Sequence, residues 1–390
     1  MPSSPELPPH LHTTKNLPSN LLPTFINAFK SSISSFSEIL ETLKPDLLIY
    51  DLFQPWAAKL ALSQGIPCVY FIVSGATASS FYRHLYTKGT ASTYPYPAIY
   101  MLDHEMNNVR EVIKSASRDP DKDFALENYT MSSDIVLVKS CREVEEKYID
   151  YLGALCKKRI VPTGPLIGRS DQDEDEDEEE EDSGILKWLS GKSYSSTVYI
   201  SFGSEHFFTE SEIEKIAKGL QLCNANFIWV IRFPLGEQNI ISLEDKLPRG
   251  FLDITKGRGM VVSGWAPQAR ILAHSSIGGF LSHCGWNSVT ESMYFGVPII
   301  AMPMKYEQPL TARMVVEAGV GVEVGRDENG NYVGEEIAKA INKVVITETT
   351  VCEGLRNTSK KLSDKIKEKE EEEVNQVAEQ LLRLCMKNKQ

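Results

Sequence analysis

The sequence predicts an α/β protein with two domains, each built on a parallel β-sheet. Its 390 residues exceed the usual size of a single hydrophobic core. Short apolar runs without alternation are typical of strands that are covered on both faces, and helical patterns separate these runs. Such an order of strands and helices indicates parallel sheets rather than a sandwich or a helical bundle.

The first domain, residues 1–165, contains three of these apolar runs and one helical pattern between them. We predict strands over Leu47–Tyr50, Cys68–Val73 and Ile135–Val138, and a helix over Trp56–Ser63. A parallel α/β domain normally begins with a strand and its crossover helix. Here a proline-rich segment leads directly into a helix, so we expect the first strands to be missing and the sequence to be truncated at its N-terminus.

That leading helix is predicted between Leu22 and Leu43. Nine apolar residues recur in this stretch at spacings of three and four. Because this period places side chains along one side of a helix, we expect a single helix with one buried face.

An acidic run separates the two halves of the chain. Asp171–Asp182 contains 11 acidic residues and no basic one. Such a segment repels itself and stays solvated, so we predict a linker over residues 166–184; a recognition segment for a basic partner is the alternative. Outside the run, 42 acidic residues (53 − 11) stand against 41 basic ones, a net charge of −1. This balance argues against nucleic-acid binding, which needs a basic surface.

The second domain, residues 185–356, has five strand-like runs separated by helical patterns, which indicates a second parallel sheet. The strands are predicted over Thr197–Phe202, Asn226–Ile231, Gly259–Val262, Gly278–Ser282 and Val297–Ala301, and the helices over Ser211–Leu222, Asn287–Phe295 and Thr311–Ala318. The charged, amphipathic segment 357–390 is predicted to form a capping helix or helix pair.

Composition also restricts where the protein acts. Seven scattered cysteines without a CxxC pair argue against a disulfide framework or a zinc site. The longest apolar stretches are far shorter than the roughly 18 residues of a membrane span, and the N-terminus lacks the pattern of a signal peptide. We therefore expect a cytoplasmic monomer with no membrane span.

An anion site is predicted where the strand Gly278–Ser282 ends. His283 and Gly285 follow in a tight turn, and a helix begins near Asn287 and Ser288. The free N–H groups and the dipole at the start of a helix favour a phosphate. Asn287 and Ser288 are also good capping residues.

Two further side chains extend this pattern towards a nucleotide. Glu291 lies one helical turn beyond Ser288, where a carboxylate would repel phosphate but accept hydrogen bonds from a ribose diol. Trp265 follows the strand Gly259–Val262, at the sheet edge where ligands of α/β folds bind, and could stack on a base. A capped helix with a solvated Glu291 and a packed His283 is the alternative.

The segment Trp265–Gln308 resembles the signature of plant secondary-product glycosyltransferases, over 44 residues (308 − 265 + 1) without a gap. The motifs PDLLIYD, GPL and TVYISFGS also occur in the order of that family, so the resemblance covers nearly the whole chain. It implies a UDP-sugar-dependent glycosyltransferase of the GT-B fold, in which two Rossmann-like domains face a cleft. The segments SSPELPPHLHTT and YDLFQPWAAKLA further resemble the sugar-on-sugar branch, such as the crocetin glucosyl ester β-1,6-glucosyltransferases.

The resemblance implies roles in donor binding for several residues of the signature and for Ser204. Trp265 and the Ala266 backbone would hold the base of the donor, and Gln268 and Glu291 would hold its ribose. The phosphates would be held by His283, Asn287 and Ser288, with help from Ser204, and the sugar by Trp286, Glu307 and Gln308. Gly285 is also expected among the residues that bind the UDP-sugar. Glu307 replaces a commoner Asp, which leaves the donor open, and Gln308 favours glucose. UDP-glucose or a related UDP-sugar is expected as co-substrate and a small glycoside as acceptor, with no cofactor and no metal.

Catalysis in this family is inverting. A histidine takes the proton of the acceptor hydroxyl, and a paired Asp orients that histidine. Asp51, at the end of the strand Leu47–Tyr50, matches the Asp, with a helix cap as the alternative. No histidine of this sequence matches the base, and we do not assign that role to His10 or His12. A catalytically impaired UDP-sugar-binding fragment or pseudoenzyme is therefore the alternative function.

Overall fold

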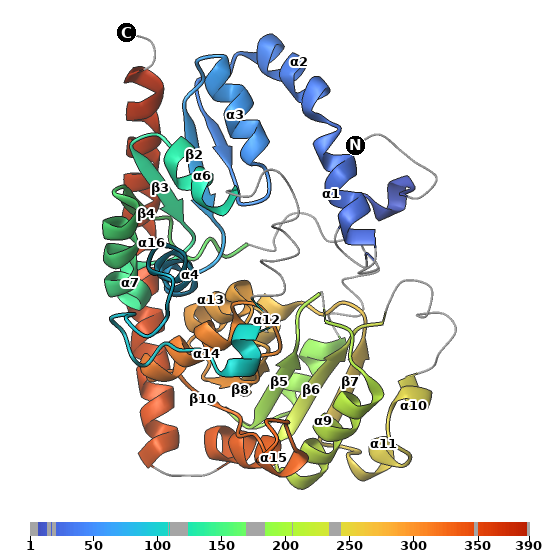
Figure 1. Cartoon of the computed structure of the whole chain (residues 1–390). Helices are drawn as coiled ribbons and strands as arrows, with labels where there is room; N and C mark the ends of the chain where they lie inside the picture. Colours follow the sequence, from blue (N-terminus) through green and yellow to red (C-terminus); the bar gives the residue numbers. More distant parts are fainter. Residues whose placement is uncertain are drawn as a thin grey trace. The chain divides into compact units, whose positions relative to one another are not determined.

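The computed structural model describes residues 7–13, 17, 21–107, 109, 124–168, 184–204, 206–233, 243–346 and 350–387. The chain divides into two compact units, one formed by 1–166 with 366–390 and the other by 167–365. Each unit contains one parallel sheet with helices beside it (Figure 1). The acidic run Asp171–Asp182 lies outside the described residues. None of the helices within these ranges is long and apolar enough to cross a bilayer.

The second unit has a six-stranded sheet in the order β10-β9-β8-β5-β6-β7. Its strands are β5 (Thr197–Ser201), β6 (Asn226–Ile231), β7 (Gly259–Ser263), β8 (Ile277–Ser282), β9 (Ile299–Ala301) and β10 (Gly321–Glu323), and its helices are α9 (Glu210–Leu222), α10 (Leu243–Lys246), α11 (Phe251–Ile254), α12 (Gln268–Ala273), α13 (Trp286–Phe295), α14 (Gln308–Glu317) and α15 (Gly334–Ile341). The chain builds outward from β5 through β6 and β7, and then crosses to β8 on the other side. Ligands of such sheets bind at this switch point, beyond the carboxyl ends of β5 and β8.

Side chains from both faces of β5 explain why this strand lies in the middle of the sheet. Val198 and Ile200 enter one hydrophobic cluster, with Trp229, whereas Tyr199 enters the other, with Phe280. All five side chains are fully or nearly fully excluded from solvent. A run without polar alternation is stable only where both faces are covered, as the sequence analysis expected.

The first unit has a four-stranded parallel sheet in the order β1-β2-β3-β4. Its strands are β1 (Leu48–Tyr50), β2 (Cys68–Ile72), β3 (Ile135–Val138) and β4 (Arg159–Pro162), and its helices are α1 (Leu22–Lys30), α2 (Ile33–Leu43), α3 (Pro55–Ser63), α4 (Ala76–Lys88), α6 (Phe124–Met131) and α7 (Arg142–Cys156). The short strands β4 and β10 were not predicted.

The prediction of one leading helix with a buried face is wrong. Two helices, α1 and α2, are separated by a turn at Ser31 and Ser32 (Figure 1). The Ser31 hydroxyl donates to the Ala28 carbonyl at 2.7 Å, a local bond that competes with helix continuation. Because only two residues separate the helices, the apolar spacing continues across the break. On α2, Leu40 is buried, but Leu43 is 71% exposed.

The predicted segment 357–390 is part of one helix, α16 (Thr350–Lys387), that contributes to both units. In the second unit, Arg356 donates to the Val345 carbonyl at 2.9 Å. From Ile366 onward the helix groups with the first unit, where Leu384 packs in a cluster with β2 and β3. Its described part, up to Lys387, therefore belongs to a single helix rather than to a helix pair.

A buried carboxylate ties the start of α4 to α7. Glu145 is fully buried, and its two oxygens accept from the Ala76 and Thr77 backbone N–H groups at 2.7 Å each and from the Thr77 and Ser140 hydroxyls at 2.6 Å each. Burial raises the pKa of Glu145, and these four donors oppose that rise. The carboxylate thus supplies acceptors to N–H groups that α4 itself cannot satisfy.

We predict that Glu145→Gln lowers the free energy of unfolding by about 2–4 kcal/mol, because an amide nitrogen cannot accept from the donors that it would face. Urea denaturation of both proteins measures the difference. Glu146→Gln on the same helix is the control, since the Glu146 side chain is 69% exposed and its ion pair with Arg142 lies on the surface. Equal unfolding midpoints for Glu145→Gln and the parent would contradict this role.

Candidate functional site

The turn after β8 is built around His283, whose imidazole lies against two glycines. A Cβ atom on Gly203 would lie 2.9 Å from the ring atoms Cε1 and Nε2, and one on Gly285 would lie 2.5 Å from Nε2. Cys284, between His283 and Gly285, takes a left-handed conformation with φ of 65°. Glycine is therefore required at both positions for the ring to occupy the switch point.

His283 is uncharged at neutral pH. Burial lowers its pKa to about 4, and electrostatic interactions with His206 and Lys305 add to the effect. Its Nδ1 atom is buried without a hydrogen-bond partner among the residues that the structure describes. A neutral imidazole offers one N–H donor and one acceptor, so His283 can hydrogen-bond an anion but does not supply a formal charge.

Helix α13 begins at Trp286, with Gly285 as the N-cap, and no side chain caps it. The prediction that Asn287 and Ser288 are capping residues is therefore wrong, because they are the second and third residues of the helix. The N–H groups of this first turn have no intrahelical partner. Backbone groups and the helix dipole, rather than a side-chain cap, thus make the predicted phosphate site.

The two residues predicted to hold a ribose are hydrogen-bonded to each other. Gln268, at the start of α12, donates through Nε2 to Glu291 Oε2 at 2.7 Å, and lies 3.3 Å from the Ser288 hydroxyl. This bond fixes the Glu291 carboxylate one turn above the start of α13. An ionised carboxylate has about four acceptor positions, so Glu291 could accept from a diol in addition to Gln268.

Trp265 lies in the turn between β7 and α12. Its side chain is 43% exposed, whereas the next residue, Ala266, is 6% exposed and belongs to the hydrophobic core. The Ala266 carbonyl accepts from the Gln268 N–H at 2.8 Å. The buried Ala266 therefore anchors the turn and leaves the indole ring available for stacking.

The exposed Ser204 follows β5, the neighbour of β8. The two strands pair in register, with Ser201 opposite Ser282. Their outgoing loops therefore leave the sheet together, which places Gly203 against the His283 ring. Ser204 lies one residue beyond this contact.

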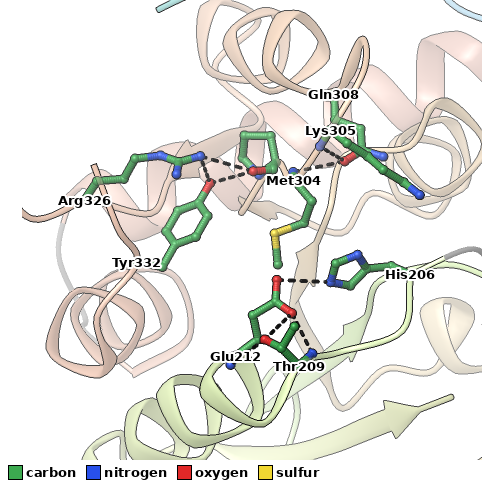
Figure 2. Close-up of polar contacts among 9 residues, drawn as sticks. His206, Thr209, Glu212, Met304, Lys305, Gln308, Arg326 and Tyr332 are labelled. Atoms are coloured by element: carbon green, nitrogen blue, oxygen red, sulfur yellow. Dashed lines mark hydrogen bonds and ion pairs between the residues drawn. The ribbon is translucent and has the colours of Figure 1, made fainter. Parts of the chain in front are cut away.

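The loop after β9 carries the residues predicted to contact a sugar. Gln308 is 5% exposed, and its Oε1 accepts from the backbone N–H groups of Met304 and Lys305 at 3.0 and 2.9 Å (Figure 2). Only its Nε2 group is left for a ligand. Glu307 is the half-buried N-cap residue of α14. The Trp286 ring is 5% exposed, so this residue presents its backbone rather than its ring at the start of α13.

Sequence reasoning missed three side chains of this region. Arg326 and Tyr332 both contact the Pro303 carbonyl, in the loop that leads to Glu307 and Gln308. The turn sequence between them, DENG, is a hairpin signal that could have drawn attention to them. Glu212 was also missed: it caps α9 and lies 3.5 Å from His206 Nε2, in the loop after β5 (Figure 2).

The Glu212 carboxylate orders that loop. Burial alone would raise the pKa of Glu212, but interactions with His206 and Thr209 outweigh it and lower the pKa to about 2. Thr209 donates to Glu212 Oε2 through its N–H at 2.8 Å and its hydroxyl at 2.9 Å. The ionised carboxylate therefore holds both ends of the segment from His206 to Thr209.

Asp51 lies in the first unit, directly after β1. Its Oδ1 accepts from the Phe53 N–H at 2.9 Å and so closes a tight turn. The alternative of a helix cap is wrong, because the N-cap of α3 is Gln54. The Asp51 charge lies near Tyr70, where it adds to burial in raising the pKa of the phenol.

We predict that Trp265→Ala weakens UDP binding by about 1–3 kcal/mol, the range for loss of one base-stacking ring. Calorimetric titration measures the two affinities. Tyr194→Ala is the control, because Tyr194 is an aromatic residue of the same unit that is 81% exposed. Equal affinities for the parent and Trp265→Ala would exclude stacking on this ring.

The low pKa of His283 predicts a pH-dependent stability. Between about pH 6.5 and 4 the unfolded chain binds a proton on this residue that the folded chain does not, so the protein loses stability as the pH falls. His283→Gln should remove about 1–2 kcal/mol of the stability loss between pH 7 and 5. Urea denaturation at both pH values measures it, and the same loss in both proteins would contradict a buried neutral ring.

Comparison with known proteins shows the family of the chain. Residues 186–361 match the family model "UDP-glucoronosyl and UDP-glucosyl transferase". UDP-glucosyltransferase 29 of Panax ginseng is 45% identical over 389 residues, which is 100% of this chain and 85% of that protein. Beta-D-glucosyl crocetin beta-1,6-glucosyltransferase of Gardenia jasminoides is 44% identical over 395 residues, 100% of this chain and 86% of that protein.

The fold is shared with a solved plant structure, Phytolacca americana UGT2 complexed with UDP-2fluoro-glucose and pterostilbene. The TM-score is 0.76 at 27% identity, over 93% of this chain and 82% of that one. This likeness confirms the predicted α/β GT-B fold. The relatives are named as transferases, so the alternative of a pseudoenzyme finds no support. The chain belongs to the UDP-glucuronosyl and UDP-glucosyl transferase family and is a plant-type UDP-glycosyltransferase.

Proposed function

We propose that this enzyme transfers glucose from UDP-glucose to a hydroxyl of a sugar that is already attached to a plant secondary metabolite. The observation that supports the donor is the Gln268–Glu291 hydrogen bond beside the start of α13. There a carboxylate that could accept from a ribose diol lies one turn from helix N–H groups that favour a phosphate. The acceptor class is supported by the relative from Gardenia jasminoides, whose name specifies a glucosylated substrate.

The site suits departure of UDP from the anomeric carbon. As the acceptor oxygen bonds to that carbon, the bond to the phosphate oxygen breaks and negative charge develops on UDP. The N–H groups in the first turn of α13 and the neutral His283 ring would receive this charge through hydrogen bonds. These groups are fixed before the donor binds, so they need little reorganisation during the reaction.

Asp51 is proposed as the carboxylate that orients the catalytic base of the acceptor side. Its Oδ1 is already used by the Phe53 N–H, so the second oxygen is the one that would face a base. None of the histidines in the described residues is assigned as that base. His84, for example, is committed on both ring nitrogens, to Tyr151 at 2.5 Å and Thr93 at 3.0 Å.

We predict that Asp51→Asn lowers transfer by at least about 100-fold, the smaller end of the effect of general-base catalysis, while UDP affinity stays unchanged. Asn keeps the oxygen that accepts from Phe53, so the turn is retained and only the charge is lost. Mass spectrometry measures the glycosylated product. Asp134→Asn, which removes a surface ion pair with Lys387, is the control. Undiminished transfer by Asp51→Asn would overturn the proposed role.

A substrate panel tests the function itself. We expect product with UDP-glucose and a metabolite glucoside, less with UDP-glucuronic acid or UDP-rhamnose, and little with the aglycone. The family resemblance implies a metal-independent reaction, so a chelator should leave the rate unchanged. Preference for the aglycone would overturn the sugar-on-sugar assignment, and preference for another UDP-sugar would overturn the donor.

A further inference from the structure

We propose that Arg326 and Tyr332 are positioning residues for recognition of the donor sugar, and that they act through the loop between Pro303 and Glu307. The inference rests on the proposed function, in which Glu307 and Gln308 contact the sugar. It assigns a task to a hairpin that lies outside the signature Trp265–Gln308.

Both side chains bind one backbone carbonyl. Pro303 O accepts from Arg326 Nη2 at 3.2 Å and from the Tyr332 hydroxyl at 2.9 Å, and Arg326 Nη2 also donates to the Tyr332 oxygen at 2.7 Å (Figure 2). The guanidinium carbon lies 3.9 Å from the centre of the Tyr332 ring. A hydroxyl that accepts from a cation is a stronger donor, so Arg326 strengthens the bond between Tyr332 and Pro303.

The opposite side of the same loop is held by Gln308. Its Oε1 accepts from the Met304 and Lys305 N–H groups, the two residues after Pro303. Three consecutive residues are thus fixed by hydrogen bonds from two directions. Because Gln308 uses its oxygen on the loop, any displacement of the loop also displaces the Nε2 group that we assign to the sugar.

The residue that follows is strained. Tyr306 has a φ of 56°, in the left-handed region that a bulky residue avoids, and its ring is 46% exposed. Such a conformation is unfavourable for a bulky residue and persists only where neighbouring contacts impose it. The contacts at Pro303, Met304 and Lys305 are the ones adjacent to it, and Glu307 comes immediately after.

The hairpin itself is rigid. Arg326 and Tyr332 face each other across an antiparallel bridge, and Asp327 Oδ1 accepts from the N–H groups of Asn329 and Asn331 at 3.0 and 2.7 Å. Arg326 Nη1 donates to the Gly330 carbonyl at 2.9 Å. Tyr332 is 7% exposed and packs in the main hydrophobic cluster of the unit. The hairpin can therefore act as a fixed support for the loop.

An effect on the sugar alone is expected, because the residues that we assign to UDP lie on other elements of the unit. The residues that we assign to the base, ribose and phosphates lie on α12, on α13 and in the loops after β5, β7 and β8. The hydrogen bonds of Arg326 and Tyr332 described above instead hold the loop after β9. Loss of these bonds should change the affinity for UDP-glucose but not that for UDP.

The test compares Tyr332→Phe and Arg326→Lys with the parent protein by calorimetric titration of UDP and UDP-glucose. Each variant should bind UDP-glucose about 3- to 10-fold more weakly, which is the effect of losing the one hydrogen bond that we assign to Gln308 Nε2 and the sugar. The affinity for UDP should stay within about 2-fold of that of the parent. Tyr94→Phe is the matched control: Tyr94 is 8% exposed, and its hydroxyl bonds Ser80 at 2.7 Å in the other unit. Melting temperatures establish that each variant is folded.

Each outcome decides the inference. A loss confined to UDP-glucose in Tyr332→Phe and Arg326→Lys, but absent in Tyr94→Phe, supports positioning of the sugar. Unchanged affinities, or equal losses for UDP and UDP-glucose, overturn it. If the parent binds another UDP-sugar in preference to UDP-glucose, the proposed donor fails, and the same comparison is made with the preferred sugar. The two failures are thereby distinguished.

Discussion

The close packing of His283 between Gly203 and Gly285 is the contact on which the proposed donor site depends. It requires β5 and β8 to be neighbours in register, because only then does the loop after β5 reach the turn after β8. That adjacency follows from the reversal of strand order, which the hydrophobic runs of the two strands make possible. Any side chain at either glycine would displace the imidazole from this position.

The polar groups of this site are paired with each other before any ligand is bound. Gln268 holds Glu291, Gln308 holds the Met304 and Lys305 N–H groups, and Glu212 holds Thr209. Such pairs reduce the entropy that donor binding would otherwise cost. The Nδ1 atom of His283 is an exception, because it is buried without a hydrogen-bond partner among the residues that the structure describes. By helix geometry, the first N–H groups of α13 have no intrahelical partner. These are the groups that we assign to an anion.

Much of the fold could be predicted because buried parallel strands have a strong apolar signal: β3 and β6 were predicted with their observed bounds. The short strands β4 and β10 were missed because they contain too few apolar residues for such a signal. The break between α1 and α2 was missed because apolar spacing does not register a two-residue turn. For the site, motif order identified the residues around α13, but not that Gly285 caps it. Arg326 and Tyr332 bind the backbone carbonyl of Pro303. Because every residue has such a carbonyl, a sequence motif cannot reveal this contact.

The proposed donor site therefore has two kinds of support. Its nucleotide part rests on the ends of regular elements, where N–H groups and the helix dipole have a direction fixed by the backbone. Its sugar part rests on a loop whose conformation is imposed by Gln308 on one side and by the Arg326–Tyr332 pair on the other. A loop can be repositioned by one substitution in its supports, whereas the start of a helix cannot. Changes of sugar preference would then arise from the supports of the loop while recognition of UDP is preserved.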